Sequence, residues 1–203
     1  MATTRQILRE KIVDRLYRGK EIIRGTTTSA GDDASLIDTA LIQGMFEVND
    51  YLGAYIWLSS GSADEEASKI IAFDRTTGDF TMSPVYSATV GSGVTYEIHY
   101  DLHPARVNES IIWSIEFGTS EALSAPTADA STTTLESEVV IEGALSFCKK
   151  AIARQTMARD PARPKTDDEI EKLLKQAQQH EANWLGGLEL LGYSPYVGLK
   201  RIG

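Results

Sequence analysis

The stretch "ASKIIAFDRTTGDFTMSPVY" (residues 67–86) decides the fold class, because it holds a complete β-hairpin signal. β-Branched and aromatic residues occupy both of its arms, as is typical of strands. Between the arms, "DRTTGD" places Asp74 at the start of a type I turn and Gly78 where the chain needs a positive φ. The stretch therefore predicts two adjacent antiparallel strands.

The same strand-like pattern extends over residues 21–100. The hydroxyl-rich stretch "RGTTTSAGDDASLIDTAL" (24–41) predicts a strand, a turn at Gly31 and Asp32, and a second strand, because threonine favours pleated surfaces and Gly/Asp favour corners. Five or six short strands with turn signals between them predict a small antiparallel barrel or sandwich. The other strand regions are "YLGAYIWLSSG" (51–61) and "VGSGVTYEIHY" (90–100), the latter with a turn at its two glycines.

Helical periodicity precedes this region, over residues 3–18. Thr3 or Thr4 can cap the start of this helix, and Gly19 can end it. Apolar residues recur at helical spacing, and we expect the basic residues to occupy the rest of the circumference. The apolar set is Ile7, Leu8, Ile12, Val13 and Leu16, and the basic set is Arg5, Arg9, Lys11 and Arg15.

Three more helices are predicted after residue 100. The first covers 101–118 and can be capped by Asp101 or His103, and a polar loop of about fifteen residues follows it, which we expect to be mobile or functional. Capping boxes then open two longer helices, Thr133 with Glu136 and Thr166 with Glu169, and Gly192 ends the last one. The apolar stripes are Val107, Ile111, Ile112 and Ile115; Ile141, Leu145, Cys148 and Ile152; and Ile170, Leu173, Leu174, Ala177, Trp184, Leu188 and Leu191.

These elements together predict an α+β fold in which a helical bundle of about four helices carries an inserted small antiparallel β-barrel or sandwich module. The N-terminal helix of the bundle takes residues 1–20 and the β module 21–100. The remaining helices take 101–192, and an extended tail takes 193–203.

Composition excludes several classes of protein. No run of 18 apolar residues exists, so we expect no transmembrane helix, and the N-terminal "MATTRQILREKIVDRL" lacks the apolar core of a secretory leader. A single cysteine, Cys148, excludes an internal disulfide and a multi-cysteine zinc site. Residues 25–100 hold two basic side chains against eleven acidic ones, and a segment so acidic does not bind phosphate backbones.

Chemical motifs give no active site, and we expect the chain not to be an enzyme and to hold no metal and no cofactor. "HEANW" places Trp184 where a zinc helix needs a second histidine after His180. Cys148 lies on an apolar stripe, where a small hydrophobe is expected rather than a nucleophile. The acidic groups "GDD" and "SADEEAS" lack the alternating ligands of a calcium loop, so they indicate solvated turns.

Contact with other chains is the remaining possibility. The tail "YSPYVGLKRIG" (193–203) is more apolar than an idle terminus needs to be, although termini also fray without any function. Tyr51, Tyr55 and Trp57 cluster in one strand region, and strand edges must be covered or paired.

Residues 24–115 resemble β modules in virion proteins of tailed bacteriophages. The similarity lies in a Gly/Thr-rich first hairpin, an aromatic strand, the hairpin "IIAFDRTTGDFTMSP", and the strand "SGVTYEI" that runs into a helix beginning near a proline. The helical stretches "EGALSFCKKAIARQ" (142–155) and "LLKQAQQHEANWLGGLELL" (173–191) are similar in style to head–tail connector, or adaptor, proteins of the phage neck. No catalytic motif comes with this family.

The resemblance implies a structural virion protein, made in the host cytoplasm, whose copies form a ring that docks on the portal and extends the DNA channel toward the tail. Such rings usually follow the twelve-fold symmetry of the portal, and a tail or nozzle protein lies beyond them. DNA would pass without specific binding, because an acidic module repels phosphates. The side chains expected to face the channel or solvent are Asp32, Asp33, Asp64, Glu65 and Glu66. The tail residues expected to bind the portal are Tyr193, Pro195, Tyr196, Val197, Leu199, Lys200, Arg201 and Ile202.

A tail-side structural protein is the alternative. A baseplate or fibre-attachment component would use the β module to bind another virion protein or a host glycan. Tyr55 and Trp57 could stack on a sugar if they were exposed.

Overall fold

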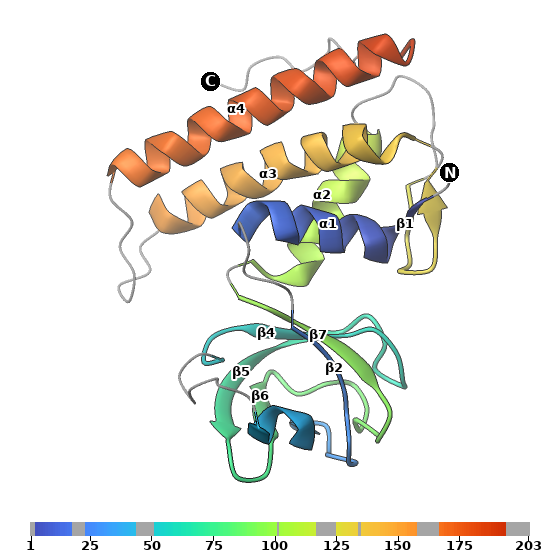
Figure 1. The fold of residues 1–203 in the computed structure, drawn as a ribbon, viewed down its shortest axis with the longest axis vertical. Coiled ribbons are helices and arrows are strands. Elements are labelled where there is room, and N and C mark those ends of the chain that lie inside the picture. The colour runs from blue at the N-terminus through green and yellow to red at the C-terminus, as the bar shows by residue number, and fades with distance from the viewer. Residues whose placement is uncertain are drawn as a thin grey trace. The chain divides into compact units, whose positions relative to one another are not determined.

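The computed structural model describes residues 3–17, 23–43, 51–100, 102–116, 125–133, 135–157 and 167–193. It is an α+β protein with four α-helices and a curled six-stranded antiparallel sheet, as the sequence predicts at that level (Figure 1). The chain divides into two compact units. Residues 1–21 and 106–203 form the helical unit, and Ile22–Ala105 form the sheet unit, close to the 21–100 expected for the β module.

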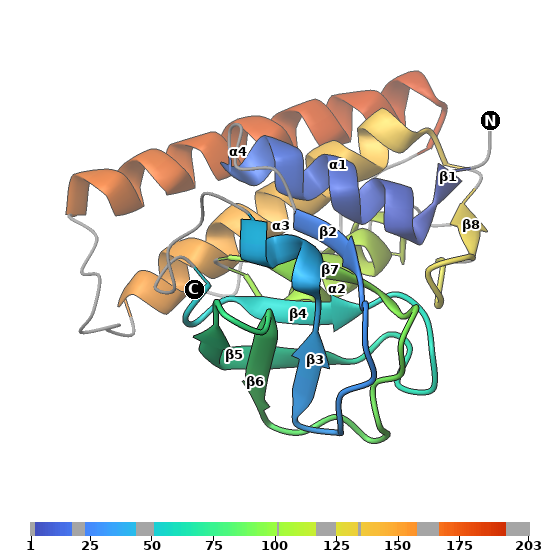
Figure 2. The ribbon, with the colours of Figure 1, turned by 60° about the horizontal axis from the view of Figure 1, so that its bottom comes forward.

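The sheet unit has the strand order β2-β7-β4-β5-β6-β3, with every neighbouring pair antiparallel (Figure 2). The hairpin predicted at residues 67–86 is confirmed, since β5 pairs with β6 and Gly78 has a φ of 72°. The turn is held by Asp74, whose carboxylate accepts the Thr76 N–H at 2.8 Å. The strands are β2 (Ile23–Thr26), β3 (Ser35–Ile37), β4 (Tyr55–Leu58), β5 (Ala67–Asp74), β6 (Asp79–Ser83) and β7 (Thr95–His99).

The stretch 24–41 forms the two predicted strands. β2 and β3 do not pair with each other directly, but an antiparallel bridge joins Ser29, three residues after β2, to Ile37 of β3. β2 and β3 lie at opposite edges of the sheet, and the 3₁₀-helix η1 (Thr39–Gln43) follows β3. The reason is that the corner between them pairs with later parts of the chain. Gly31 donates its N–H to the Val90 carbonyl at 2.9 Å, and the carbonyl of Asp33 accepts the Tyr86 N–H at 2.8 Å.

The core of the sheet unit lies on one face of the curled sheet. Its centre is an aromatic cluster in which the Phe80 ring stacks on Phe73 at 4.5 Å and meets Tyr51 edge-on at 5.2 Å. A second contact depends on a glycine: Gly25 pairs with Tyr96 across the strands, and a Cβ at Gly25 would lie 2.2 Å from the Tyr96 hydroxyl. That hydroxyl donates to the Asp38 carboxylate at 2.6 Å, so the glycine lets the tyrosine cross β2 and reach its partner.

The helices of the chain are α1 (Arg5–Tyr17), α2 (Pro104–Glu116), α3 (Ser137–Met157) and α4 (Asp167–Leu190). Two predicted caps are confirmed. The Thr4 hydroxyl accepts the Ile7 N–H at 3.3 Å, and His103 Nδ1 accepts the Ala105 N–H at 3.2 Å, with Pro104 in the first helical turn.

The end of α4 is a Schellman motif. Gly192 has a φ of 82°, its N–H donates to the Glu189 carbonyl, and the Tyr193 N–H donates to the Leu188 carbonyl at 2.9 Å. The prediction that Gly192 ends this helix is therefore confirmed. Thr166, proposed as the cap at the other end of α4, and Gly19, Asp101 and most of the tail lie outside the described residues.

The capping box predicted at Thr133 and Glu136 is wrong. Thr132–Thr133 form the short strand β8, which pairs with β1 (Thr3–Thr4), and α3 begins only at Ser137. Because the Thr133 hydroxyl accepts the Leu135 N–H at 3.2 Å, it belongs to the turn before the helix.

Two glycines bring the helices of the helical unit close together. A Cβ at Gly143 of α3 would lie 2.7 Å from Cβ of Ser114 in α2 and 2.8 Å from Nε1 of Trp184 in α4. A Cβ at Gly187 would lie 2.8 Å from a methyl group of Val139, so α3 and α4 run antiparallel in close contact, as Figure 1 shows. The predicted apolar residues of the four helices are buried or half-buried, except Ile7 of α1, which is 43% exposed, and Leu191, which is 42% exposed.

The sequence predicts that Arg5 and Arg9 lie away from the apolar side of α1, but both are buried. Arg9 is fully buried and binds both carboxylate oxygens of Asp129, at 2.6 and 2.7 Å, and Arg5 donates to the same carboxylate at 3.0 and 3.1 Å. These bonds join residues 127–129 to α1, so this part of the loop, which is expected from the sequence to be mobile or functional, is held against the helix. Residues 119–124 of that loop lie outside the described residues.

Candidate interaction surfaces

Formal charge is divided unequally between the two units. Residues 22–105 hold twelve acidic side chains against three basic ones, which equals the net charge of −9 of the whole chain. The residues of the helical unit are balanced, with seventeen of each sign. The sheet unit is therefore the part of the protein that repels polyanions.

The five acidic residues singled out from the sequence lie in two turns of the sheet unit. Asp32, Asp33 and Asp64 are exposed, and Glu65 and Glu66 are half-buried. Hydrogen bonds from Ser35 and Ala34 lower the pKa of Asp32, which keeps this carboxylate charged.

Both turns have an internal structural role. Glu66 accepts hydrogen bonds from the N–H and hydroxyl of Ser87, and so ties its turn to the chain after β6. The carboxylate of Asp32 accepts the Ala34 N–H at 2.8 Å within the other turn. Over the described residues, no group of three or more His, Cys, Asp or Glu side chains has a metal-binding arrangement.

Asp79 is an acidic residue whose charged form is expected to lower the stability of the sheet unit. One of its carboxylate oxygens is buried and accepts no hydrogen bond among the described residues. Partial burial, followed by repulsion from Asp32 and Asp74, raises its pKa. Because the pKa of the Asp79 carboxyl group is higher in the folded protein than in the unfolded chain, the protonated form favours folding. The contribution of Asp79 to stability is therefore complete below its unfolded pKa and is lost as the pH rises through its folded pKa.

We therefore expect Asp79→Asn to stabilise the sheet unit at pH 7, by under about 1 kcal/mol, and to have a smaller effect at pH 3. Urea unfolding of variant and parent at the two pH values measures the difference. Asp33→Asn, which removes an exposed carboxylate, is the matched control. An equal effect of Asp79→Asn at both pH values would contradict this explanation.

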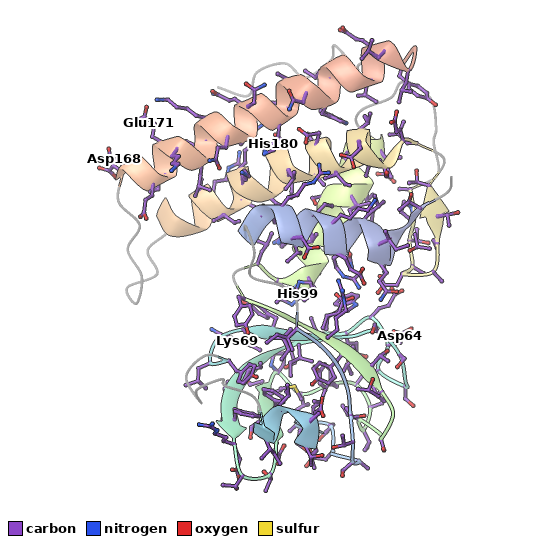
Figure 3. The ribbon with its side chains drawn as sticks, in the orientation of Figure 1. Asp64, Lys69, His99, Asp168, Glu171 and His180 are labelled. Atoms are coloured by element: carbon purple, nitrogen blue, oxygen red, sulfur yellow. The ribbon has the colours of Figure 1, made fainter. Side chains whose placement is uncertain are left out.

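The three histidines each have a structural partner. His180 of α4 points toward α3 (Figure 3), and its Nδ1 lies 2.9 Å from a Glu142 carboxylate oxygen. The neighbouring Glu181 pairs with Lys150. His99 Nε2 lies 2.9 Å from Glu97 two residues earlier on β7. His103, besides capping α2, meets the Tyr55 ring edge-on at 4.8 Å.

Cys148 is buried in the helical unit, as its place on the apolar stripe predicts. Burial raises the pKa of its thiol to about 12, and the sulfur lies 3.3 Å from the Ser110 hydroxyl. Because the thiolate is the reactive form, we expect the native protein to react with a disulfide reagent at least about 100-fold more slowly than the protein in denaturant. Fast, stoichiometric labelling of the native protein at pH 8 would show that this interpretation is wrong.

A shallow apolar depression lies on the surface of the helical unit. It is formed by α2 and α3, has a volume of about 230 Å³, and is lined by Glu109, Ile112, Trp113, Glu116 and Phe147. The Trp113 ring lies 5.6 Å from Phe147 and 5.1 Å from Trp184, so the floor is a cluster of aromatic rings. The sequence analysis missed it, because only Ile112 stood in a predicted stripe.

The other predicted contact residues are placed only in part. Trp57 is 4% exposed and Tyr55 half-buried, which removes the flat exposed ring that sugar stacking requires. Of the tail residues, Tyr193 is half-buried, and Pro195, Tyr196, Val197, Leu199, Lys200, Arg201 and Ile202 lie outside the described residues. In the described ranges, no helix combines the length and apolarity that a membrane span requires.

Comparisons with known proteins give no relative. No protein family, no curated protein and no solved structure matches the chain significantly.

Proposed function

We propose that this chain is a structural component of a phage neck: a connector that assembles into a ring, docks on the portal and extends the DNA channel. In this proposal the four helices form a bundle, and the sheet unit is a small barrel-like module inserted into it. The proposal includes that the chain is not an enzyme. It starts from the sequence resemblance over residues 24–115.

The observation that carries the proposal is the separation of charge between the units. A protein that surrounds moving DNA must present a surface that does not hold phosphates, because attraction to Lys and Arg would slow the passage of the duplex. The sheet unit carries the whole net charge of −9, and the acidic Asp32, Asp33 and Asp64 are exposed on it. The helical unit has no net charge, so further copies of it would not repel one another as the sheet units would.

The tail is the proposed contact with the portal. Tyr193 is held at the end of α4, so residues 194–203 leave from a fixed point. Deletion of 194–203 is expected to reduce attachment to portal rings by at least about tenfold, because the segment supplies apolar and basic contacts. Co-sedimentation with purified portal rings measures attachment. Undiminished attachment of the shortened chain would reject this role for the tail.

The size of the assembled particle tests the function itself. Light scattering of the purified chain, with and without a purified phage portal protein, is expected to give a ring-sized particle of about twelve copies. A stable trimer, or retention on immobilised glycans, would support the tail-side alternative instead. Hydrolysis of a cell-wall or nucleic-acid substrate by the purified chain would contradict the non-enzymatic assignment.

A further inference from the structure

We propose that the aromatic depression on α2 and α3 binds the chain's own C-terminal segment, residues 194–203. The inference goes beyond the proposed function, since it concerns a single subunit and requires neither a ring nor a portal. It assigns a binding surface, its occupant and the residues that make the contact.

The chemistry of the two surfaces is complementary. The floor of the depression is apolar, with Ile112, Trp113 and Phe147 half-buried, and two carboxylates, Glu109 and Glu116, lie at its rim. A segment that fits must combine apolar side chains with positive charge. The tail does so: "YVGLKRIG" has Val197 and Leu199, which point to the same side of an extended chain, followed by Lys200 and Arg201.

The rim charges are available to a basic partner. Glu116 is exposed and has no ion pair with another residue that the structure describes. Glu109 pairs with Arg106 at 2.7 Å, but both side chains are more than half exposed, and such a pair exchanges partners at little cost.

The end of α4 lies within reach of the depression. Trp184 contacts Trp113, and α4 continues for about 10 Å from Trp184 to Leu191. The ten residues after Tyr193 span up to about 33 Å when extended, whereas the depression follows α2 from Glu109 to Glu116 for only about 10 Å. The segment can therefore turn back and lie across it.

The tail cannot bind a portal and this depression at the same time, because both contacts use the same tail side chains. The depression would hold the tail in the free subunit, and the portal would have to displace it. A subunit with a released tail is then expected to attach to portals more readily.

Disulfide trapping tests the inference directly. Glu109→Cys with Ile202→Cys places one thiol at the rim and one in the tail, while Glu116 and the contact residues Val197, Leu199, Lys200 and Arg201 are retained. Ala182→Cys with Ile202→Cys is the matched control, because Ala182 is exposed on α4 about 17 Å from Tyr193, within reach of the tail but outside the depression. Cys148 is buried and can remain. Native folding of each variant is checked by circular dichroism before oxidation.

The expected result is a disulfide-linked monomer that forms at least about tenfold faster for the Glu109 pair than for the Ala182 pair, at a rate independent of protein concentration. A linked dimer would mean that the tail binds a second copy, and equal rates for the two pairs would mean that the depression does not hold the tail. Either outcome overturns the inference, whether or not rings form.

Charge reversal gives an independent measurement on the same cysteine pair. Lys200→Glu with Arg201→Glu is expected to slow the trapping several-fold, and the addition of Glu116→Lys is expected to restore part of the rate. If Lys200→Glu with Arg201→Glu slows the trapping and Glu116→Lys does not restore the rate, the Glu116 carboxylate does not contact the tail. That result would overturn the assignment of the contact.

Discussion

Asp129→Ala is expected to destabilise the helical unit by about 3–5 kcal/mol, because it removes a carboxylate that two buried arginine side chains bind. The Asp129 carboxylate accepts two hydrogen bonds from Arg9 and two from Arg5. Arg9 is fully buried and also donates to the side-chain carbonyl of Asn108 at 3.1 Å, a neutral group that cannot replace the charge of the carboxylate. Because the free energy of unfolding of a small domain is only about 5–15 kcal/mol, this loss is a large part of the total stability.

Urea unfolding followed by the helical circular dichroism signal measures this loss. The matched control is Arg15→Ala, which removes ion pairs with Glu138 and Glu142. The Arg15 side chain is 41% exposed, so its loss should change stability by less than about 1 kcal/mol. A similar small effect of Asp129→Ala would mean that water reaches the arginines and that the cluster does not hold residues 127–129 against α1.

Phe80→Ala is expected to destabilise the sheet unit by about 3–5 kcal/mol. Phe80 is fully buried at the centre of the aromatic cluster, 4.5 Å from the Phe73 ring and 5.2 Å from that of Tyr51. Alanine would remove both ring contacts and leave a cavity that the short strands around it cannot close without moving. Val85→Ala removes an apolar side chain that is 55% exposed and is expected to change stability by less than about 0.5 kcal/mol.

Near-ultraviolet circular dichroism and urea unfolding of the two variants measure the difference. A loss of stability in Phe80→Ala no larger than in Val85→Ala would contradict the position of the core. Because the chain has two units, unfolding should be fitted with separate transitions where the probes disagree.

Local signals predicted the local structure well. The turn "DRTTGD", the caps at Thr4 and His103 and the end of α4 at Gly192 each depend on a few neighbouring residues, and the structure confirms all four. The number of strands in the main sheet followed from the same kind of evidence.

Features that depend on distant partners could not be predicted. β2 and β3 are neighbours in sequence, but pairing with later segments places them at opposite edges of the sheet. Arg9 has the polarity of a surface residue, and its burial depends on an ion pair with Asp129, 120 positions later in the sequence. Strands of two residues, such as β1 and β8, are too short to show an alternation of apolar and polar residues in the sequence.

The candidate surfaces show the same division. The acidic character of the sheet unit was visible in the sequence, because its charges are contiguous along the chain. The depression on α2 and α3 could not be predicted from the sequence, because Trp113 and Phe147 come from separate helices. The packing of these two helices depends on their close contact at Gly143.

Electron microscopy of the full chain, alone and mixed with a purified phage portal protein, would distinguish a neck connector from a protein of another kind. We expect closed rings with twelve-fold averages that stack on the portal, with the sheet units lining or facing the channel. A compact monomer in both samples, with no density added to the portal, would contradict this expectation.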